Sequence, residues 1–390
     1  MLARVQDEEE KLILSTVNEL MKKYDERYWL DKDLKREFPL DFLQEFSELG
    51  LGSVLIPKEN GGAGKGLRLA CEILYHVNVN GGNSYFIHGH YYNTTLLVKH
   101  AGKLIREKYF EGIVKGAKVL SLALTEPDVG SDSTRIKTLA RKKDDRTYVI
   151  NGHKIFISRL KYSDFMIVVA RTIPYDVVER KTDGITLFLV DLRVSRDNID
   201  MKEIKTMSNT SAFEVFLNNL EVPAENVIGE VNRGFYYLLD LLNAERFMIA
   251  SEMIGNAEWF INKAVEYARN RVVFGKPIGS YQGVQFPIAK VYAELEAVKS
   301  YFNDGIEHFD KDKDSKLIGS YANISKYLAT EIAWEAGNIA MDTYGGYGYA
   351  VDTGIERKLR ETRLYKVAPV SQNLVLSYIA NHILNLPKSY

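Results

Sequence analysis

The order in which the hydrophobic pattern changes along the chain constrains the fold most. In residues 1–119, and again from residue 229 to the end, apolar residues recur at the three- and four-residue spacing of amphipathic helices. Residues 120–228 instead hold short β-favouring runs bounded by Gly, Asp, Asn and Pro. Segregated helical and β segments predict an α+β fold rather than a parallel Rossmann sheet. We therefore predict an N-terminal α-helical domain (1–119), a middle β-barrel or β-sandwich domain (120–228) and a C-terminal helical bundle (229–390).

The same periodicities predict individual elements. Helices are expected at 8–23, 40–49, 67–79 and 93–116 in the first domain, and at 232–269, 282–309 and 316–343 in the last. Strands are expected at 119–124, 147–150, 165–170, 185–190 and 212–217.

Charge and composition argue against several classes of protein. The net charge of −1 provides no basic surface for nucleic acid or an anionic membrane, and no apolar run is long enough to span a bilayer. The single cysteine, Cys71, excludes a disulfide within the chain and fits a reducing, cytoplasmic setting. The first residues, MLARVQDEEEKLIL, do not resemble a secretory signal. Because HExxH and CxxC spacings are absent, we expect no metal site.

The segment from Leu124 to Asp132 reads LTEPDVGSD and follows a predicted strand. Its proline and glycine predict a tight turn at the strand exit, and its small residues would let the backbone approach a flat ligand closely. Ser131 adds a hydroxyl group. A plain solvated turn explains the same residues, so this segment alone leaves both interpretations open.

Asn151 and Gly152 stand between two β-favouring runs, in the segment NGHKIFIS that ends at Ser158. An Asn-Gly pair flanked by such runs is a strong short-range signal for a hairpin. We therefore predict a β-hairpin that turns at these two residues.

Two further segments are ambiguous on their own. Residues 269–278, RNRVVFGKPI, end a predicted helix with Gly and Pro. Their arginines suit either bidentate phosphate binding or capping of the last helical carbonyls. Residues 344–349, YGGYGY, either let the backbone approach a phosphate or ring, or merely break a helix. They are not a P-loop, since no Lys-Ser/Thr follows.

Taken together, in this order and at these separations, the motifs resemble those of the acyl-CoA dehydrogenase family over essentially the whole chain. The family pattern begins with a proline and a GGxG turn, here Pro57 and Gly61–Gly64. It continues with TEPxxGSD, NGxKxxI[ST], RxxFGxPIxxxQ and GGxG[YF], followed by ERxxR, here residues 356–360. The resemblance implies an N-terminal helical domain, a middle β domain and a C-terminal four-helix bundle. FAD would lie between the last two, near a subunit interface.

The resemblance also implies a reaction and partners. Such an enzyme dehydrogenates an acyl-CoA thioester to a 2,3-enoyl-CoA, as in fatty-acid β-oxidation, with flavin N5 accepting the β-hydride. It would pass electrons to an electron-transferring flavoprotein. It would also assemble as a homotetramer, a dimer of dimers.

Site residues follow from the resemblance position by position. Those expected to line the flavin and the acyl-CoA are Leu122, Leu124, Thr125, Gly130 and Ser131, with Phe156, Ile157 and Ser158 flanking the flavin ring. Those expected at the FAD pyrophosphate and adenine are Arg271, Phe274 and Gln282 from a neighbouring subunit, with Asp342, Gly345, Gly346, Ser371 and Asn373. The family usually has Gln where Asp342 stands. Substrate contacts are expected from Ser131, Leu242 and Arg246.

The catalytic base departs from the commonest family pattern. Most members carry their glutamate near the C-terminus, in a slot that here falls on Pro369. A minority, including isovaleryl- and long-chain-type enzymes, carry it on the first helix of the bundle, in the context LxxER. This sequence reads LLNAER there, so the resemblance assigns the base to Glu245.

The local pattern around Glu245 supports that assignment independently. Glu245 lies within an apolar stripe at helical spacing. The stripe is formed by Leu238, Leu241, Leu242, Met248 and Ile249. Burial would raise the pKa of its carboxyl towards the range useful for a general base. An ion pair with an arginine on another helix, or a wet interface, would also explain a glutamate there.

Pro369 raises a second question. In the family, the thioester oxygen accepts hydrogen bonds from the FAD ribityl hydroxyl and from the backbone N–H of the C-terminal catalytic position. Proline has no N–H. Either the loop shifts by one residue, so that Ala368 or Val370 donates, or the donor is lost.

Two alternatives to a dehydrogenase remain. One is a flavin oxidase or monooxygenase on the same fold, because such relatives also alter the C-terminal loop. The other is a catalytically silent FAD-binding protein. Ser131, Glu245 and Arg246 favour the dehydrogenase.

Overall fold

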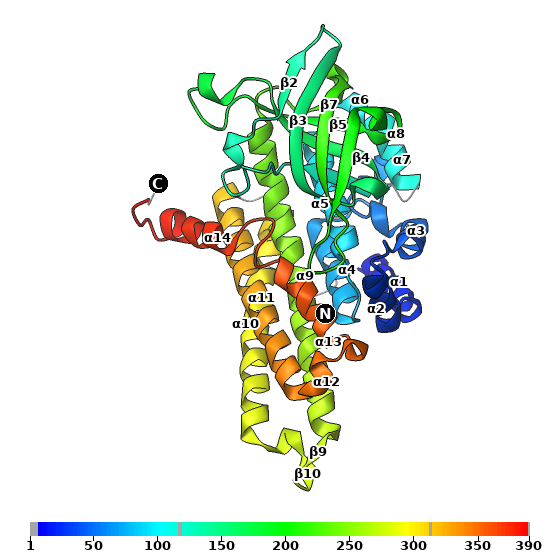
Figure 1. The fold of residues 1–390 in the computed structure, drawn as a ribbon, viewed down its shortest axis with the longest axis vertical. Helices are drawn as coiled ribbons and strands as arrows, with labels where there is room; N and C mark the ends of the chain where they lie inside the picture. Colours follow the sequence, from blue (N-terminus) through cyan, green and yellow to red (C-terminus); the bar gives the residue numbers. More distant parts are fainter. Residues whose placement is uncertain (1–6, 116–118, 312–313, 389–390) are drawn as a thin grey trace.

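The structure, a computed structural model, describes residues 7–115, 119–311 and 314–388. Figure 1 shows a β-sheet at one end of a bundle of long helices, with α1, α2 and α3 along one side. This arrangement confirms the α+β fold and its succession of helical, β and helical parts. The first 14 residues were interpreted as unlike a secretory signal, and residues 1–6 of that segment lie outside the described residues.

The N-terminal part is helical, as predicted, but its elements differ from the expected ones in two places. Helix α2 was not predicted, because Trp29 is its only buried residue and one residue makes no stripe. A continuous helix over 93–116 is wrong: α5 starts earlier and ends before Ala101 and Gly102. Since α5 is buried over most of its surface, it shows little amphipathic pattern. The helices are α1 (Glu8–Lys23), α2 (Glu26–Lys35), α3 (Leu40–Glu48), α4 (Leu67–Val79), α5 (Tyr85–His100), α6 (Lys103–Ile105) and α7 (Glu111–Lys115).

The middle part is one eight-stranded sheet in the order β6-β7-β3-β2-β4-β5-β8, with β1 paired in parallel to β4. All five predicted strands are present, and β2, β6 and β8 were not predicted because they are short or largely exposed. The strands are β1 (Val119–Ala123), β2 (Leu139–Lys142), β3 (Thr147–Ser158), β4 (Ser163–Arg171), β5 (Ile185–Asp191), β6 (Ile199–Ile204), β7 (Ala212–Pro223) and β8 (Val227–Ile228).

The predicted hairpin at Asn151 and Gly152 is wrong. Strand β3 runs straight through both residues, and its pairing with β7 only shifts register between Ile150 and Gly152. Asn151 bonds across this irregularity to Asn219, whose amide N–H donates to Asn151 Oδ1 at 2.9 Å. Gly152 packs so closely on Thr138 that an added Cβ would lie 2.3 Å from Thr138 Oγ1. The glycine therefore serves a close approach between strands, not a turn.

The C-terminal part is built on three long helices, and each predicted span agrees with its observed helix to within two residues. Helix α9 is the centre of the molecule, because it contacts α4 and α5 on one side and α10 and α11 on the other. The helices are α9 (Gly234–Asn270), α10 (Gln282–Asp310), α11 (Ser315–Tyr344), α12 (Gly346–Tyr349), α13 (Ile355–Leu364) and α14 (Gln372–Tyr378), with a hairpin of β9 (Val272–Val273) and β10 (Lys276–Pro277).

Burial along α9 explains why the helical parts form one core. Leu241, Phe247 and Ile254 are fully buried in a cluster that also contains residues of α4 and α5. Each such side chain contributes about 1.5–3 kcal/mol through burial, and truncating Phe247 to alanine would cost about 3–5 kcal/mol. Among the described residues, no helix is long and apolar enough to cross a membrane.

Candidate active site

The predicted turn after strand β1 is present. The backbone groups of Glu126 and Val129 exchange two hydrogen bonds, at 3.1 and 3.0 Å. The Glu126 carboxylate then accepts the amide N–H groups of Lys137 at 2.6 Å and Thr138 at 2.9 Å. Glu126 is thus a structural part of the turn, fixing the chain that leaves it.

A buried lysine on β3 holds this turn. Lys154 Nζ donates to the Leu124 carbonyl and to Glu126 Oε1, each at 2.9 Å, and its side chain is 0% exposed. Burial lowers the pKa of Lys154 to about 8, although Glu126 opposes the shift. The sequence showed Lys154 only as a member of a motif, and its contact with the other motif is set by the tertiary fold.

The end of β3 lies beside the strand exit of β1. The Ile155 amide donates to the Thr125 carbonyl at 2.9 Å, which brings the residues expected on both sides of a flavin ring together. Phe156 has a left-handed backbone (φ +57°) and is 57% exposed, whereas Ile157 is buried. The Tyr85 hydroxyl of α5 donates a hydrogen bond to Ser158 Oγ.

Glu245 lies on α9 and is buried, with 4% of its surface exposed. Its Oε2 atom has no hydrogen-bond partner among the described residues. Burial raises the pKa of Glu245 to about 8, and the charges of Arg246, Arg159 and Lys326 act against that rise. A lone buried carboxyl with such a pKa is suited to general acid–base chemistry.

Two of the nearby cations are themselves held in place. Arg246 Nη1 donates to Asn243 Oδ1 at 2.9 Å, and burial lowers its pKa to about 10. Lys326, fully buried on α11, donates from Nζ to the Val370 carbonyl at 2.8 Å, and burial lowers its pKa to about 8. Through Lys326, the loop after α13 is tied to the surroundings of Glu245.

The same loop contains Pro369, and its hydrogen bonds show which neighbour of Pro369 has a backbone N–H available to donate. The Ala368 amide donates to the Leu364 carbonyl at 3.0 Å, so its hydrogen is already used. The Val370 amide makes no hydrogen bond within the described part of the chain. Of the two neighbours of Pro369, only Val370 therefore keeps a free donor.

Comparison with known proteins identifies the family. Residues 7–117, 121–220 and 232–384 match the models of the acyl-CoA dehydrogenase N-terminal, middle and C-terminal domains. The caffeyl-CoA reductase-Etf complex subunit CarC of Acetobacterium woodii is 32% identical over 336 residues, covering 85% of this chain and 86% of that protein. The chain belongs to the acyl-CoA dehydrogenase family.

Other relatives agree with this assignment. The acyl-CoA dehydrogenase FadE12 of Mycobacterium bovis is 29% identical over 389 residues, covering 99% of this chain and 98% of that one. The structure of butyryl-CoA dehydrogenase from Megasphaera elsdenii shares the fold with a TM-score of 0.90 at 24% identity, covering 98% and 99% of the two chains. The chain is accordingly an oxidoreductase of the acyl-CoA dehydrogenase family, whose members are typically FAD-dependent.

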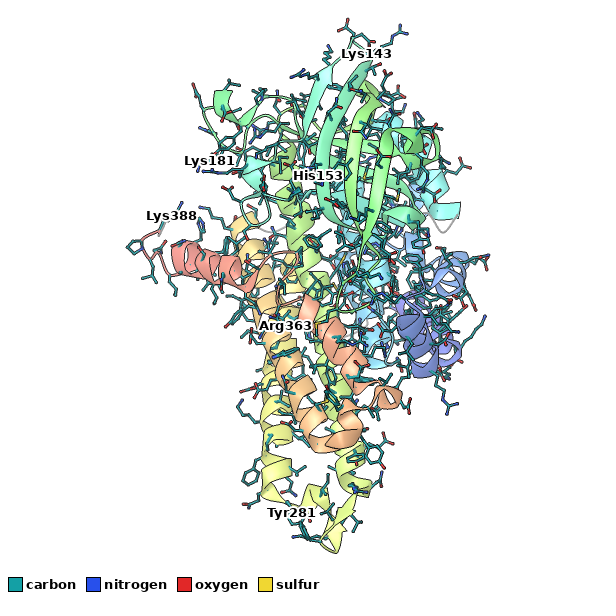
Figure 2. All side chains as sticks on the ribbon, in the orientation of Figure 1. Lys143, His153, Lys181, Tyr281, Arg363 and Lys388 are labelled. Carbon is teal, nitrogen blue, oxygen red and sulfur yellow. The ribbon has the colours of Figure 1, made fainter. Side chains whose placement is uncertain are left out.

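The remaining predicted FAD contacts lie elsewhere in the chain. Arg271 follows α9 at the end away from the sheet, and Glu245 precedes it by 26 residues, or about 39 Å of helix. Figure 2 shows Tyr281, beside the predicted Gln282, at the opposite end of the molecule from His153 in the sheet. One chain therefore does not bring Arg271, Phe274 and Gln282 to Glu245, and their expected role across a subunit interface stays a prediction.

The other predicted FAD contacts lie in two further places, at the end of α11 and at the start of α14. Tyr344, which precedes Gly345 and Gly346, stacks on Tyr267 with ring centroids 4.2 Å apart, so this turn lies near the distal end of α9. Asp342 belongs to the last turn of α11. Ser371 caps α14 by accepting the Leu374 amide at 3.4 Å, and Asn373 is exposed on the same helix.

A second buried polar group near Glu245 was missed from the sequence. Glu252, two helical turns further along α9, accepts the Ser84 hydroxyl at 2.5 Å and lies 3.0 Å from His88 Nδ1. The Tyr365 hydroxyl is 3.2 Å from the same nitrogen. The seven-residue spacing from Glu245 to Glu252 was the available signal, since it places both carboxylates on one face of a helix.

Proposed function

We propose that this protein is an FAD-dependent dehydrogenase that converts an acyl-CoA thioester to a 2,3-enoyl-CoA, with Glu245 as the base. The observation that carries the proposal is the lone carboxylate of Glu245, buried and without a partner for Oε2. Its raised pKa, and the proline in the usual C-terminal slot, both support the assignment. Within the family, this placement is of the isovaleryl- and long-chain-type.

In the proposed reaction, Glu245 takes the proton from the α-carbon of the thioester. The carboxylate must be ionised to do so, and the charges of Arg246, Arg159 and Lys326 favour the ionised form. Because the base is fixed on the central helix, it is oriented before the substrate arrives. The Val370 amide, which has no other acceptor in the described chain, is our candidate donor to the thioester oxygen.

The residues at the joined ends of β1 and β3 fit a flavin. The exposed Phe156 ring offers a flat apolar surface, the open backbone at Gly130 would admit a close approach, and Ser158 offers a hydroxyl. When bound, FAD would supply the two-electron acceptor for the hydride from the β-carbon. We assign Leu122, Leu124, Thr125, Ser131 and Ile157 to the same site.

We also propose that a homotetramer completes the FAD site and that an electron-transferring flavoprotein is the electron acceptor. The distance from Arg271 to Glu245 along α9 supports the first point, because one chain cannot place both at one flavin. The relative named as a subunit of a reductase-Etf complex supports the second. Chemical crosslinking or light scattering of the purified protein should give the mass of four chains.

Anaerobic bleaching of the flavin by acyl-CoA thioesters tests the function. We expect the oxidised flavin absorbance to fall with at least one member of a panel of straight, branched and carboxylated acyl-CoAs. Glu245→Gln should retain FAD and show no bleaching. If none of the thioesters in the panel reduces the flavin, the protein is not an acyl-CoA dehydrogenase. Rapid reoxidation of the reduced flavin by air would favour an oxidase instead.

A further inference from the structure

Arg159 is a buried arginine without a counter-ion. Its side chain is 1% exposed, and it forms no ion pair with any carboxylate of the described residues. Nη1 donates to the Tyr85 carbonyl at 3.0 Å, while Nε has no partner within the described chain. An unpaired buried charge is costly, so an arginine in this state points to an anion that joins it in the working enzyme.

The fold makes room for this guanidinium. Arg159 follows Ser158 with a left-handed backbone (φ +64°), and its side chain lies against α5. The guanidinium carbon is 5.3 Å from the centroid of the Tyr85 ring. An added Cβ on Gly89 would lie 1.6 Å from Arg159 Nη2, so the glycine in α5 leaves the space that the guanidinium occupies.

Arg159 is close to the base but does not neutralise it. Arg159 Nη1 donates to the Tyr85 carbonyl, and the adjacent Ser84 hydroxyl donates to Glu252 on the helix of the base, so the start of α5 contacts both Arg159 and α9. The charge of Arg159 also acts on Glu245, Tyr85 and Tyr92. No ion pair joins Arg159 to Glu245. The other nearby carboxylate, Glu252, already accepts Ser84 and contacts His88.

The surroundings of Glu245 are therefore polar and rich in positive charge. Arg246, Lys326 and Arg159 outnumber Glu245 and Glu252, and the tyrosines add hydroxyl groups. An aliphatic acyl chain that reached Glu245 would leave Arg159 desolvated and unpaired. A carboxylate would balance the charge of the guanidinium and accept a hydrogen bond from its unpartnered Nε–H.

We propose that Arg159 binds a carboxylate on the acyl group, so that the substrate is the monothioester of a short dicarboxylic acid. This rests on the proposed function, because the acyl group is placed by its α-carbon at Glu245. The carboxylate lies beyond the β-carbon, towards α5, where Arg159 contacts Tyr85 and Gly89.

The test compares thioesters of equal chain length with and without a terminal carboxylate: glutaryl-CoA against valeryl-CoA, and adipoyl-CoA against hexanoyl-CoA. Wild-type kcat/KM, followed by flavin reduction, should be about 10- to 100-fold higher for the carboxylated member of the better pair, the range expected for one charge-assisted contact. Arg159→Met should remove this preference. Arg159→Lys, which keeps the charge, should retain part of it.

Gly89→Ala tests the same contact without removing a charge. The new methyl group displaces the guanidinium, so the preference for the carboxylated thioester should fall while turnover of valeryl-CoA is kept. Gly102→Ala is the matched control, because an added Cβ there meets no atom within 4 Å. Binding measured calorimetrically in a Glu245→Gln background should show the same ranking without turnover.

The outcomes separate the inference from the function. Bleaching by valeryl- or hexanoyl-CoA with no advantage for either dicarboxylic thioester overturns the inference and leaves the dehydrogenase standing. An equal loss on both members of a pair in Arg159→Met, with a shifted pH profile, would show that Arg159 serves Glu245 alone and also overturns it. Absence of bleaching by any thioester removes the function and the inference together.

Discussion

Lys154 and Glu126 form a buried ion pair, with Nζ 2.9 Å from Oε1, that joins strand β3 to the turn after β1. Both side chains are almost wholly buried, so neither charged group is solvated by water. The pair thus fixes the relative position of the two segments proposed to hold the flavin.

Lys154→Met should weaken the contact between strand β3 and the turn after β1. The Glu126 carboxylate would remain buried with only backbone partners, at a cost of about 3–5 kcal/mol. We expect a lower melting temperature and faster loss of FAD on dilution, measured by flavin fluorescence. Lys161→Met, on the exposed turn after β3, is the control and should change neither. Unchanged stability in Lys154→Met would contradict the structural role of the pair.

Glu245→Gln should lower kcat by at least about 10²–10⁴-fold, because the amide cannot accept the α-proton. The loss should appear in flavin reduction under single-turnover conditions, with the flavin spectrum otherwise normal. Glu266→Gln lies on an exposed part of the same helix and should retain wild-type rates. Turnover near the wild-type level in Glu245→Gln would mean that another group is the base.

The rate should depend on pH through Glu245. With a pKa of about 8, the free enzyme gains ionised base as pH rises. We therefore expect kcat/KM to increase about tenfold per pH unit below pH 8 and to level off above it. A flat profile from pH 6 to 9 would exclude Glu245 as the group that titrates.

Stability should depend on pH with the opposite sign. The pKa of Glu245 is raised from 4.5 to about 8 in the folded protein, so the folded state binds the proton more tightly than the unfolded state. Its contribution to the free energy of unfolding is full below about pH 4.5 and is lost as pH rises to about 8. Melting curves should therefore show Glu245→Gln gaining stability relative to wild type across that window, by about 1.4 kcal/mol per pH unit at most. A constant difference would contradict the raised pKa.

Gly152→Ala should destabilise the sheet by about 1–3 kcal/mol, because the methyl group would collide with Thr138. Thr138→Ala removes the two nearest obstructing atoms, Oγ1 and Cγ2, and leaves the Thr138 Cβ, which an added Cβ would meet at 2.6 Å. The Thr138 hydroxyl has no hydrogen-bond partner in the described chain. The double variant should therefore recover part of the lost melting temperature. A hairpin at residues 151 and 152 would instead tolerate alanine at 152 without any such rescue.

Much of the architecture was predictable from the sequence because its elements are long and periodic. Helices α10 and α11 match their apolar stripes closely, since each has one face on the core. Helix α9 is buried on more than one side at its middle, and the length of its helical pattern still predicted it. Helix α5 defeated the same reasoning, because a helix buried all around shows no stripe. The Asn-Gly pair in β3 misled the turn prediction, since a glycine that permits a turn also permits close packing.

The sequence by itself determined the order of the parts, the family motifs and Glu245 as a carboxylate on an apolar stripe. Hydrophobic periodicity and turn-forming residues act over a few neighbouring positions, so they can be recognised in the sequence. The tertiary structure alone decided that Lys154 meets Glu126 and that Arg159 is buried without an ion pair among the described residues. It also decided that the Ala368 N–H is already hydrogen-bonded, whereas the Val370 N–H has no acceptor in the described part of the chain. These contacts depend on which distant segments pack together and on which partners a buried charge can reach. The spacing of residues along the chain does not predict either.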